Sequence, residues 1–466
     1  MSTDILIVGA GPAGATAAVR LAESGVACTL LDDNAQAGGQ IFRAGTAPKS
    51  IPGADPRGAR LRESLARHRA LIDYRPQHEV VGLHAGPRLW ARGPDGHIAQ
   101  FTPRHLVLAT GAIEVGVPVP GWTAPGVYTL GGLQILLKSS GVVPARPVML
   151  GGAGPLLYLV AAQLASLGVP LAAVVDAAPL PTLTQLAGMA RRPDLLGQGL
   201  RYAFALKRRG VPVLRRHAVV EIVGDGPNRE IVVAPLDADW RPGGTGHRRI
   251  AAEVVGLGFG LRPNTELTQL AGCAHDYDAT RGGWCVRRTA DCGTTVPGIF
   301  VIGDGAGIGG VERALAEGTV VADVLARGQG RGSDRLAADA GKARRALAPL
   351  DSFRKALEAW SGLRPGIFEA VRPETIVCRC EDVRRGEIDT ALAGGLAVPR
   401  GLKLATRAGM GLCQGRTCAP ALQHLIARAA GIDPSALPMP TVRMPTRPVS
   451  AAALAALSPA IDEAAR

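Results

Sequence analysis

Short apolar runs alternate with glycine-rich turns and helical patterns along the chain. The first run covers residues 5–8, a helical pattern over residues 13–24 follows its turn, and a second apolar run covers residues 27–31. The same order begins again near Val148. Fully apolar runs of this length are typical of parallel strands buried between helices. The pattern therefore predicts an α/β protein that contains two Rossmann-like domains.

Later segments add two strands and a separate module. Apolar runs over residues 106–109 and 299–302 each end in a small polar pair, and a charged helical stretch leads to a cysteine-rich module over residues 375–432. Residues 147–175 carry no charge and are long enough to span a bilayer. A glycine turn and the break at Gly168-Val169-Pro170 divide that segment. We therefore expect strand, turn, helix and strand there, not a membrane helix.

The first glycine turn has the spacing of a dinucleotide-binding motif. It reads Gly9-Ala10-Gly11-Pro12-Ala13-Gly14 and lies between the predicted strand and helix, which makes it more specific than the glycines alone. In such a turn Gly9 permits the tight bend, Gly11 lets a pyrophosphate approach the backbone, and Gly14 lets helix and strand pack closely. The phosphates would then lie at the positive end of the helix.

An acidic residue stands at the end of the second predicted strand. Asp32 follows the turn by about twenty residues, where a carboxylate can accept hydrogen bonds from ribose hydroxyls. Asp33 is the adjacent alternative, but its side chain should point to the other face, because side chains alternate along a strand. We expect the turn and Asp32 to bind an adenine dinucleotide together.

Three later features resemble two-domain flavoproteins of the glutathione reductase type. They are Gly38-Gly39-Gln40, Thr110-Gly111 at one strand end, and Gly303-Asp304 at another. The resemblance covers residues 1–330 and implies that FAD binds the first domain, with Gly39 and Gln40 among its candidate contacts. It also implies that Asp304 contacts the ribityl chain and that the following helix points its amino end at the flavin. Thr110 and Gly111 match the connection between the two domains.

The second glycine turn departs from the pattern. In Gly152-Ala153-Gly154-Pro155-Leu156-Leu157, a leucine takes the third glycine position. Asp176 stands near the end of the next strand, where a ribose-binding acid is expected. Gly152 and Gly154 are thus candidates for a second nucleotide, NAD(P) or another adenine nucleotide, with an empty fold as the alternative. The cysteine pair that disulfide reductases of this type carry beside the flavin is missing, so we expect no thiol–disulfide chemistry there.

The strongest chemical signal is a set of four cysteines near the C-terminus. One residue separates Cys378 from Cys380, and four separate Cys413 from Cys418. Two close pairs of thiolates indicate a metal site, and a cluster is favoured over zinc because zinc sites more often use Cys-x2-Cys pairs. In an extended segment the sulfurs of Cys378 and Cys380 would lie on one side. Arginines that could offset the charge of a [2Fe–2S] cluster are Arg379, Arg384, Arg385, Arg407 and Arg416.

This module resembles the [2Fe–2S] domain of bacterioferritin-associated ferredoxin, in which the second pair is usually Cys-x2-Cys. With the flavoprotein pattern and residues 409–416, nearly the whole chain is similar to the A (alpha) subunits of heteromeric opine oxidases and D-hydroxyproline dehydrogenases, and to the B subunit of hydrogen cyanide synthase. The resemblance implies an electron-transfer subunit with FAD and a [2Fe–2S] cluster. A β subunit of the D-amino-acid-oxidase type would oxidise an amino or imino acid on its own flavin. Further candidate partners are a downstream acceptor and a small third subunit.

Two other functions fit the same motifs. A stand-alone NAD(P)H-dependent flavin and iron–sulfur reductase would need a working second nucleotide site. A non-catalytic iron–sulfur carrier with a vestigial flavin fold would bind no FAD. The sequence offers no histidine or carboxylate that can be placed at a reacting carbon, so no catalytic base is predicted.

The motifs divide the chain into five parts, the last of them rich in Pro and Ala. The parts are an FAD-binding domain over residues 1–125 and 255–335, a second dinucleotide-binding domain over residues 126–254, a helical linker over residues 336–374, a small α-helical [2Fe–2S] domain over residues 375–432 and a tail over residues 433–466.

Composition and charge add only a few constraints. With 47% hydrophobic and 20% charged residues, the 466-residue chain is not intrinsically disordered, and with 4% aromatic residues its cores must be built from Ala, Leu and Val. The net charge of +13 comes mostly from dispersed arginines, and we expect no nucleic-acid partner. The densest basic stretch, residues 191–216, is interpreted as a solvated helix face, with a docking patch for a partner chain or a membrane as the alternative.

The expected location is the cytoplasm. The first residues lead directly into an apolar strand without a charged start or a cleavage site, and the eight cysteines do not form the pattern of a secreted disulfide framework. Peripheral association with the inner face of the cell membrane is the alternative.

Overall fold

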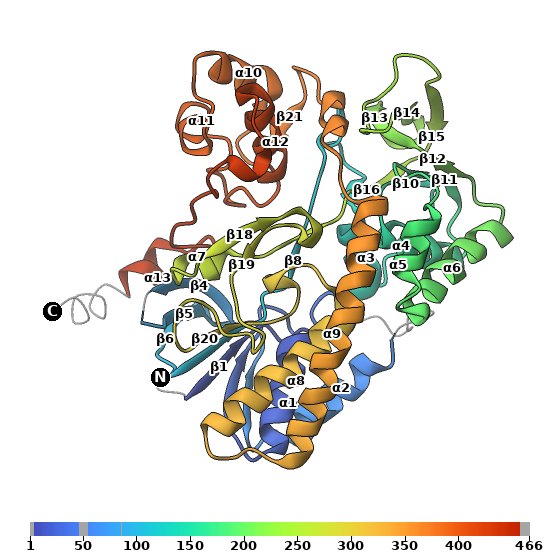
Figure 1. The fold of residues 1–466 in the computed structure, drawn as a ribbon. Coiled ribbons are helices and arrows are strands. Elements are labelled where there is room, and N and C mark those ends of the chain that lie inside the picture. The colour runs from blue at the N-terminus through green and yellow to red at the C-terminus, as the bar shows by residue number, and fades with distance from the viewer. Residues whose placement is uncertain (1–3, 46–54, 85, 457–466) are drawn as a thin grey trace.

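Two parallel sheets and a small helical module make up the fold (Figure 1). This computed structural model describes residues 4–45, 55–84 and 86–456. The first sheet has the strand order β20-β7-β1-β2-β3, so a late strand joins four early ones. Its strands are β1 (Ile5–Val8), β2 (Cys28–Leu31), β3 (Ile72–Arg75), β7 (His105–Leu108) and β20 (Ile299–Val301).

Alternate residues of β1 face two different layers. Ile5 and Ile7 belong to a core shared with helices, whereas Leu6 and Val8 belong to a core shared with a small antiparallel sheet. The helices are α1 (Pro12–Glu23), α2 (Arg57–Arg67), α8 (Gly310–Gly328) and α9 (Asp334–Ser361), and the small sheet comprises β4 (Glu79–His84), β5 (Arg88–Arg92) and β6 (Ile98–Phe101). All four positions of β1 are buried, which explains why the run carries no polar residue.

The second sheet repeats the same design with the order β12-β11-β10-β16-β9. Its strands are β9 (Val127–Thr129), β10 (Val148–Gly152), β11 (Leu171–Asp176), β12 (Val213–Arg215) and β16 (Val254–Gly258). The flanking elements are α3 (Leu130–Ser140), α4 (Pro155–Ser166), α5 (Leu183–Met189), α6 (Pro193–Arg208) and the antiparallel strands β13 (His217–Val223), β14 (Glu230–Pro235) and β15 (Arg248–Ala251). The charge-free segment thus forms strand, turn, helix and strand. Among the described helices, none has the length and apolar character that crossing a bilayer requires.

Two short strands connect the sheets. β8 (Ala112–Glu114) leaves the first sheet and pairs antiparallel with β17 (Leu261–Pro263), which returns from the second. The chain then forms α7 (Glu266–Leu270) and the hairpin β18 (His275–Asp278) and β19 (Gly283–Val286) before it re-enters the first sheet.

The C-terminal module lies beyond the long helix α9 and beside β18 (Figure 1). It contains β21 (Ile376–Cys378), β22 (Val383–Arg384), α10 (Arg385–Ala393), α11 (Pro399–Thr406) and α12 (Ala419–Ala430). The tail then returns to the first domain, where the Thr446 N–H donates to the Val81 carbonyl at 2.8 Å, and ends its described part after α13 (Ala451–Ala455). Residues 457–466 of the predicted tail lie outside the described residues.

Small residues bring α1 and α8 close together, and one glycine provides a test. A Cβ at Gly318 would lie 2.5 Å from the Ala13 carbonyl oxygen, whereas one at Gly328 in the same helix would meet nothing within 4 Å. We expect Gly318→Ala to lower the free energy of unfolding by about 1–3 kcal/mol, as overpacking does. Gly328→Ala should change it by less than about 1 kcal/mol in the stabilising direction. Urea unfolding of both variants measures this, and equal midpoints would contradict the close contact.

Candidate functional site

The first glycine turn lies at the carboxyl edge of the first sheet. Gly9 has a φ of +100°, and a Cβ there would lie 2.4 Å from the Ala109 carbonyl oxygen. A Cβ at Gly14 would lie 1.9 Å from the Gly9 oxygen, so both positions require glycine for packing. Gly11 differs, because a Cβ there would meet only the Gly39 Cα, at 3.9 Å. The turn therefore leaves room at Gly11, directly before the first turn of α1, where Pro12 and Ala13 are buried.

Asp32, not Asp33, lies at this turn. The Asp32 carboxylate is 4% exposed and accepts hydrogen bonds from the Ala10 N–H and from the Asn34 N–H, the latter at 2.7 Å. Asp33 is exposed and accepts a hydrogen bond only from the Asn34 side chain among the bonds of the described residues. Burial raises the pKa of Asp32, and its hydrogen bonds from Asn34 and Ala10 oppose that shift. Both acids follow the last residue of β2, and the Asn34 amide donates to both carboxylates, so they differ in burial and not through alternation along the strand.

The other two predicted segments meet the same turn. A Cβ at Gly303 would lie 3.0 Å from the Ala13 Cβ, and one at Gly305 would lie 2.8 Å from the Thr110 Oγ. Asp304 accepts hydrogen bonds from the N–H groups of Gly309 and Gly310, both at 2.9 Å, and so caps the start of α8. The sheet therefore brings together the glycine turn, Thr110-Gly111 and Gly303-Asp304.

Residues near Gly39 close one side of this region. Gly39 has a φ of +57°, and a Cβ there would lie 2.9 Å from the Gly11 Cα. Gln40 is exposed, and its carbonyl accepts a hydrogen bond from the Lys138 ammonium of α3 at 3.2 Å. Burial lowers the pKa of Lys138 to about 8. This contact joins the Gly39 loop to the second domain.

A buried ion cluster behind Gly303 was not predicted. Glu317 of α8 is 1% exposed and accepts hydrogen bonds from the Gly303 N–H at 2.8 Å, from Arg288 at 2.5 Å and from Arg313 at 2.7 Å. Burial alone would raise the pKa of Glu317, but the two guanidinium groups lower it overall. The cluster fixes the backbone of the Gly303 turn. Its members are far apart in sequence, so no local pattern indicates it.

The region fits a dinucleotide such as FAD. The open space at Gly11 adjoins the N-terminus of α1, which favours phosphate. The side-chain oxygen of Asn264 is buried and has no hydrogen-bond partner within the described residues. Asn264 also holds the strand end, because its carbonyl accepts the Thr110 hydroxyl at 2.9 Å and its N–H donates to the Gly111 carbonyl at 3.0 Å. A buried acceptor at this position is what a bound ligand would satisfy.

The second glycine turn is covered by the chain itself. Asp176 is fully buried and already accepts hydrogen bonds from the Tyr158 hydroxyl at 2.6 Å and the Ala178 N–H at 3.0 Å. A Cβ at Gly154 would lie 3.6 Å from the hydroxyl of Ser361, the last residue of α9. Leu157, at the third glycine position, is fully buried among α3, α4 and their sheet. Both the expected acid and the expected turn are therefore engaged by protein.

The four predicted ligand cysteines come together in two pairs. A hydrogen bond joins the thiols of Cys378 and Cys418, which are both buried, and another joins Cys380 and Cys413, which are more exposed. The bond from Cys418, with the N–H of Gly409 at 3.4 Å, lowers the pKa of the Cys378 thiol to about 5. A pairing of two and two suits a cluster with two irons better than one tetrahedral ion.

The expected extended path through both early cysteines is wrong. β21 ends at Cys378, and the chain turns at Arg379 and Cys380 so that it can pair with β22 within a few residues. Asp382, with a φ of +54°, completes this reversal. The thiol that pairs with Cys378 is therefore that of Cys418, while the Cys380 thiol pairs with Cys413.

The five arginines expected near the cluster have other partners. Arg379 lies over the Trp122 ring at 5.5 Å, Arg384 donates to the Glu374 carbonyl, Arg385 pairs with Asp389, Arg407 pairs with Glu381 and Arg416 pairs with Glu266. Of these, Arg416 forms an ion pair with the first domain, through Glu266, and Arg379 reaches the Trp122 ring. A sixth, Arg262 of β17, lies in the electrostatic range of Cys413 and Cys418 and was missed, because the short β17 has no apolar pattern.

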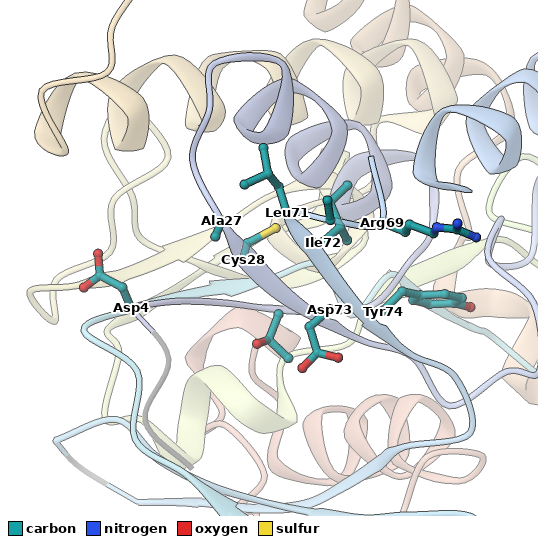
Figure 2. A pocket seen from close by; sticks show the side chains of 10 residues that line it. Asp4, Ala27, Cys28, Arg69, Leu71, Ile72, Asp73 and Tyr74 are labelled. Atoms are coloured by element: carbon teal, nitrogen blue, oxygen red, sulfur yellow. The ribbon is translucent and has the colours of Figure 1, made fainter. Parts of the chain in front are cut away.

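The remaining cysteines and one surface hollow lie elsewhere. Cys28, Cys273, Cys285 and Cys292 are buried. An open hollow of about 510 Å³ lies at Asp4, Cys28 and Asp73 (Figure 2). These residues stand at the amino ends of the first-sheet strands, and Asp73 pairs with Arg75. The hollow is thus at the opposite edge from the glycine turn.

Comparisons with known proteins agree with this geometry. A family model for pyridine nucleotide-disulphide oxidoreductases matches residues 3–318, and one for BFD-like [2Fe–2S] binding domains matches residues 376–428. Hydrogen cyanide synthase subunit HcnB of Pseudomonas protegens is 35% identical over 442 residues, or 92% of this chain and 93% of that protein. The A subunit of opine oxidase from Agrobacterium tumefaciens is 35% identical over an aligned length of 480. That alignment covers 97% of this chain and 92% of that protein. The crystal structure of L-proline dehydrogenase from P. horikoshii shares the fold, with a TM-score of 0.69 at 17% identity over 97% of this chain and 79% of that one.

Fold, site and matches together define an oxidoreductase that uses FAD and a [2Fe–2S] cluster, an electron-transfer flavoprotein. Within the pyridine nucleotide-disulphide oxidoreductases, the chain belongs to the family that contains hydrogen cyanide synthase subunit HcnB together with the A subunit of opine oxidase.

Substitution of Gly11 tests the FAD site. Gly11 has a φ of −68°, which any residue adopts, so Gly11→Val should fold but fill the place of the pyrophosphate. We expect flavin absorbance per protein to fall to near zero while iron content stays at the wild-type level. Gly199→Val is the matched control, because a Cβ there meets nothing within 4 Å. Normal flavin content in Gly11→Val would contradict the assignment of the FAD site to this turn.

Substitution of Cys413 tests the cluster site. A serine hydroxyl is a poor ligand for iron, so Cys413→Ser should lose the iron and the cluster spectrum but keep the flavin. Cys273→Ser, a buried cysteine bonded to Thr294, should keep both. Iron and acid-labile sulfide analysis measures the difference. Wild-type iron in Cys413→Ser would show that Cys413 is not a ligand.

Proposed function

We propose that this chain is the electron-transfer subunit of a heteromeric amino- or imino-acid dehydrogenase of the opine or D-hydroxyproline type. A partner subunit of the D-amino-acid-oxidase type would oxidise the C–N bond on its own flavin, and this chain would relay the electrons to a downstream acceptor. Hydrogen cyanide synthase subunit HcnB, like the A subunit of opine oxidase, is named as one subunit of an enzyme. Because both groups of relatives are similarly close, the proposal concerns their shared role and leaves the individual amino or imino acid open.

The observation that carries this proposal is the covering of the second glycine turn. NAD(P)H would need that turn and a free acid beside it. Asp176 is fully buried and hydrogen-bonded, and the indole N–H of Trp360, next to the end of α9, donates to the Pro179 carbonyl at 2.7 Å over the same edge. Electrons that do not come from NAD(P)H must come from another donor, and a partner subunit is the donor that the relatives' names suggest.

The residues around the first site support a role in relay, not in substrate chemistry. Asp304 is committed to the N–H groups at the start of α8, and Glu317 is committed to two arginines. The Glu317 carboxylate is therefore not free to take a proton from a substrate carbon, and the Oδ1 atom of Asp304 is occupied by two backbone N–H groups. The oxidation of an amine is therefore assigned to the partner.

The proposed cofactor contacts follow from these positions. FAD would be held by Gly9, Gly11, Pro12, Ala13, Gly14, Asp32, Gly39, Gln40, Thr110, Gly111, Gly303 and Asp304, and the cluster by Cys378, Cys380, Cys413 and Cys418. FAD exchanges electrons singly or in pairs and the cluster exchanges them singly, so the combination suits a relay from a two-electron donor to a one-electron acceptor. Gly152 and Gly154 are assigned to the packing of the second fold and not to nucleotide binding. The five-part division of the chain belongs to the same proposal.

An anaerobic visible spectrum tests the source of the electrons. Because the second turn is covered, we expect NADH and NADPH to leave the flavin band unchanged over minutes, while dithionite bleaches it fully. A disulfide reductase with an open second site serves as the positive control. Rapid bleaching by NADH or NADPH would overturn the proposal in favour of a stand-alone reductase. A chain purified with iron but without flavin would favour an iron–sulfur carrier.

A further inference from the structure

The loop that carries Cys413 and Cys418 is attached to the first domain by buried charges. Arg416, between these two cysteines, donates to the Glu266 carboxylate of α7 at 2.5 Å and to the Thr446 carbonyl of the tail at 2.8 Å. Arg447 of the tail donates to the same carboxylate at 3.0 Å. The Glu266 side chain is 11% exposed. Three segments far apart in sequence therefore meet at one carboxylate.

Arg262 adds a fourth segment to this contact. It lies on β17 and donates to the Arg416 carbonyl at 3.1 Å. Its Nε is buried and has no hydrogen-bond partner within the described residues, and the same is true of the Arg416 Nε. The positive charge of Arg262 lies in the electrostatic range of Cys413, Cys418 and Glu266. Two buried N–H donors without partners thus belong to the contact that carries the loop between Cys413 and Cys418.

The strand that carries Arg262 also reaches the FAD side. Two residues further on, Asn264 donates its N–H to the Gly111 carbonyl at 3.0 Å and accepts the Thr110 hydroxyl at 2.9 Å. One short stretch of backbone therefore contacts the FAD-binding edge at one end and the cluster loop at the other. A displacement of this stretch would change both sites together.

We propose that Arg262 is a positioning residue that holds the cluster loop against the FAD domain and raises the reduction potential of the [2Fe–2S] cluster. This inference rests on the proposed function, because it requires a cluster on the four cysteines. It assigns to β17 the role of setting how readily the cluster accepts an electron from the flavin side.

Electrostatics gives the direction of the effect. When the cluster takes up one electron, no bond forms or breaks and its negative charge grows by one unit. A guanidinium is always protonated, so Arg262 stabilises the more negative reduced form more than the oxidised form. Screening by water is limited on the side of Arg262, because its Nε and Cys418 are buried. N–H donors beside cluster sulfurs act in the same direction.

Two substitutions with opposite expected signs test the proposal. Arg262→Met removes the positive charge and should shift the midpoint potential of the cluster to a more negative value. Glu266→Gln removes the negative charge from the same contact and should shift it to a more positive value. Arg262→Lys keeps the charge and should stay closer to wild type than Arg262→Met. Arg249→Met, which removes an exposed arginine paired with Glu230 in the second domain, is the control and should leave the potential nearly unchanged.

The measurement is a dithionite titration of the purified chain followed by the EPR signal of the reduced cluster, with iron content as a check on occupancy. A merely structural role would broaden the signal or lower the iron content but would not produce opposite shifts in the two variants. We also expect the rate of electron transfer from the reduced flavin to the cluster to fall on the order of tenfold in Arg262→Met, as changes in the groups around metal ligands do.

Each outcome decides one question. Opposite shifts of the midpoint potential in Arg262→Met and Glu266→Gln support the proposal. If Arg262→Met loses its iron, the proposal is supported by a positive shift in Glu266→Gln together with a potential close to wild type in Arg262→Lys. Unchanged potentials, or shifts of the same sign, overturn it. Neither result bears on the proposed function, which fails instead if the wild-type chain holds no cluster or if NADH reduces its flavin.

Discussion

One buried carboxylate shared by two arginines determines where the iron–sulfur module sits on the flavin domain. Glu266 lies on α7, Arg416 comes from the loop between two ligand cysteines, and Arg447 comes from the tail. A buried carboxylate without partners is costly, and so is a buried guanidinium, so each of these side chains requires the others. Because arginine donors have a fixed planar geometry, this contact fixes orientation as well as proximity. The distance between the flavin edge and the cluster loop is therefore a property of the charge pairing.

The second domain also contacts the iron–sulfur module, through apolar side chains. Its glycine turn and acid have the form of a nucleotide site, yet the end of α9 lies against the turn and Asp176 is hydrogen-bonded internally. Its core joins that of the C-terminal module through Ala153, Ala177 and Phe259, which share one apolar cluster with Phe368 and Leu425. The second fold therefore also packs against the module through apolar side chains.

The sequence was sufficient for the features that depend on neighbouring residues. Both parallel sheets and both glycine turns follow from apolar runs and from the spacing of glycines, which are local signals. The four cysteines could be grouped for the same reason, since few residue types hold a cluster. The reversal at Cys380 could not be foreseen, because it depends on pairing with a two-residue strand. The charged contacts between domains were equally out of reach, because Arg416 and Glu266 are 150 residues apart and Arg262 is 154 residues from its partner carbonyl.

The return of the tail to the first domain has a consequence for how the chain unfolds. Thr446 and Arg447 complete the contact around Arg416 and Glu266, so the tail, the cysteine loop and α7 share one set of charged groups. Separation of any one of these segments would leave buried charges without partners in the others, which is costly. The iron–sulfur module and the flavin domain should therefore unfold as one cooperative unit and not as independent domains.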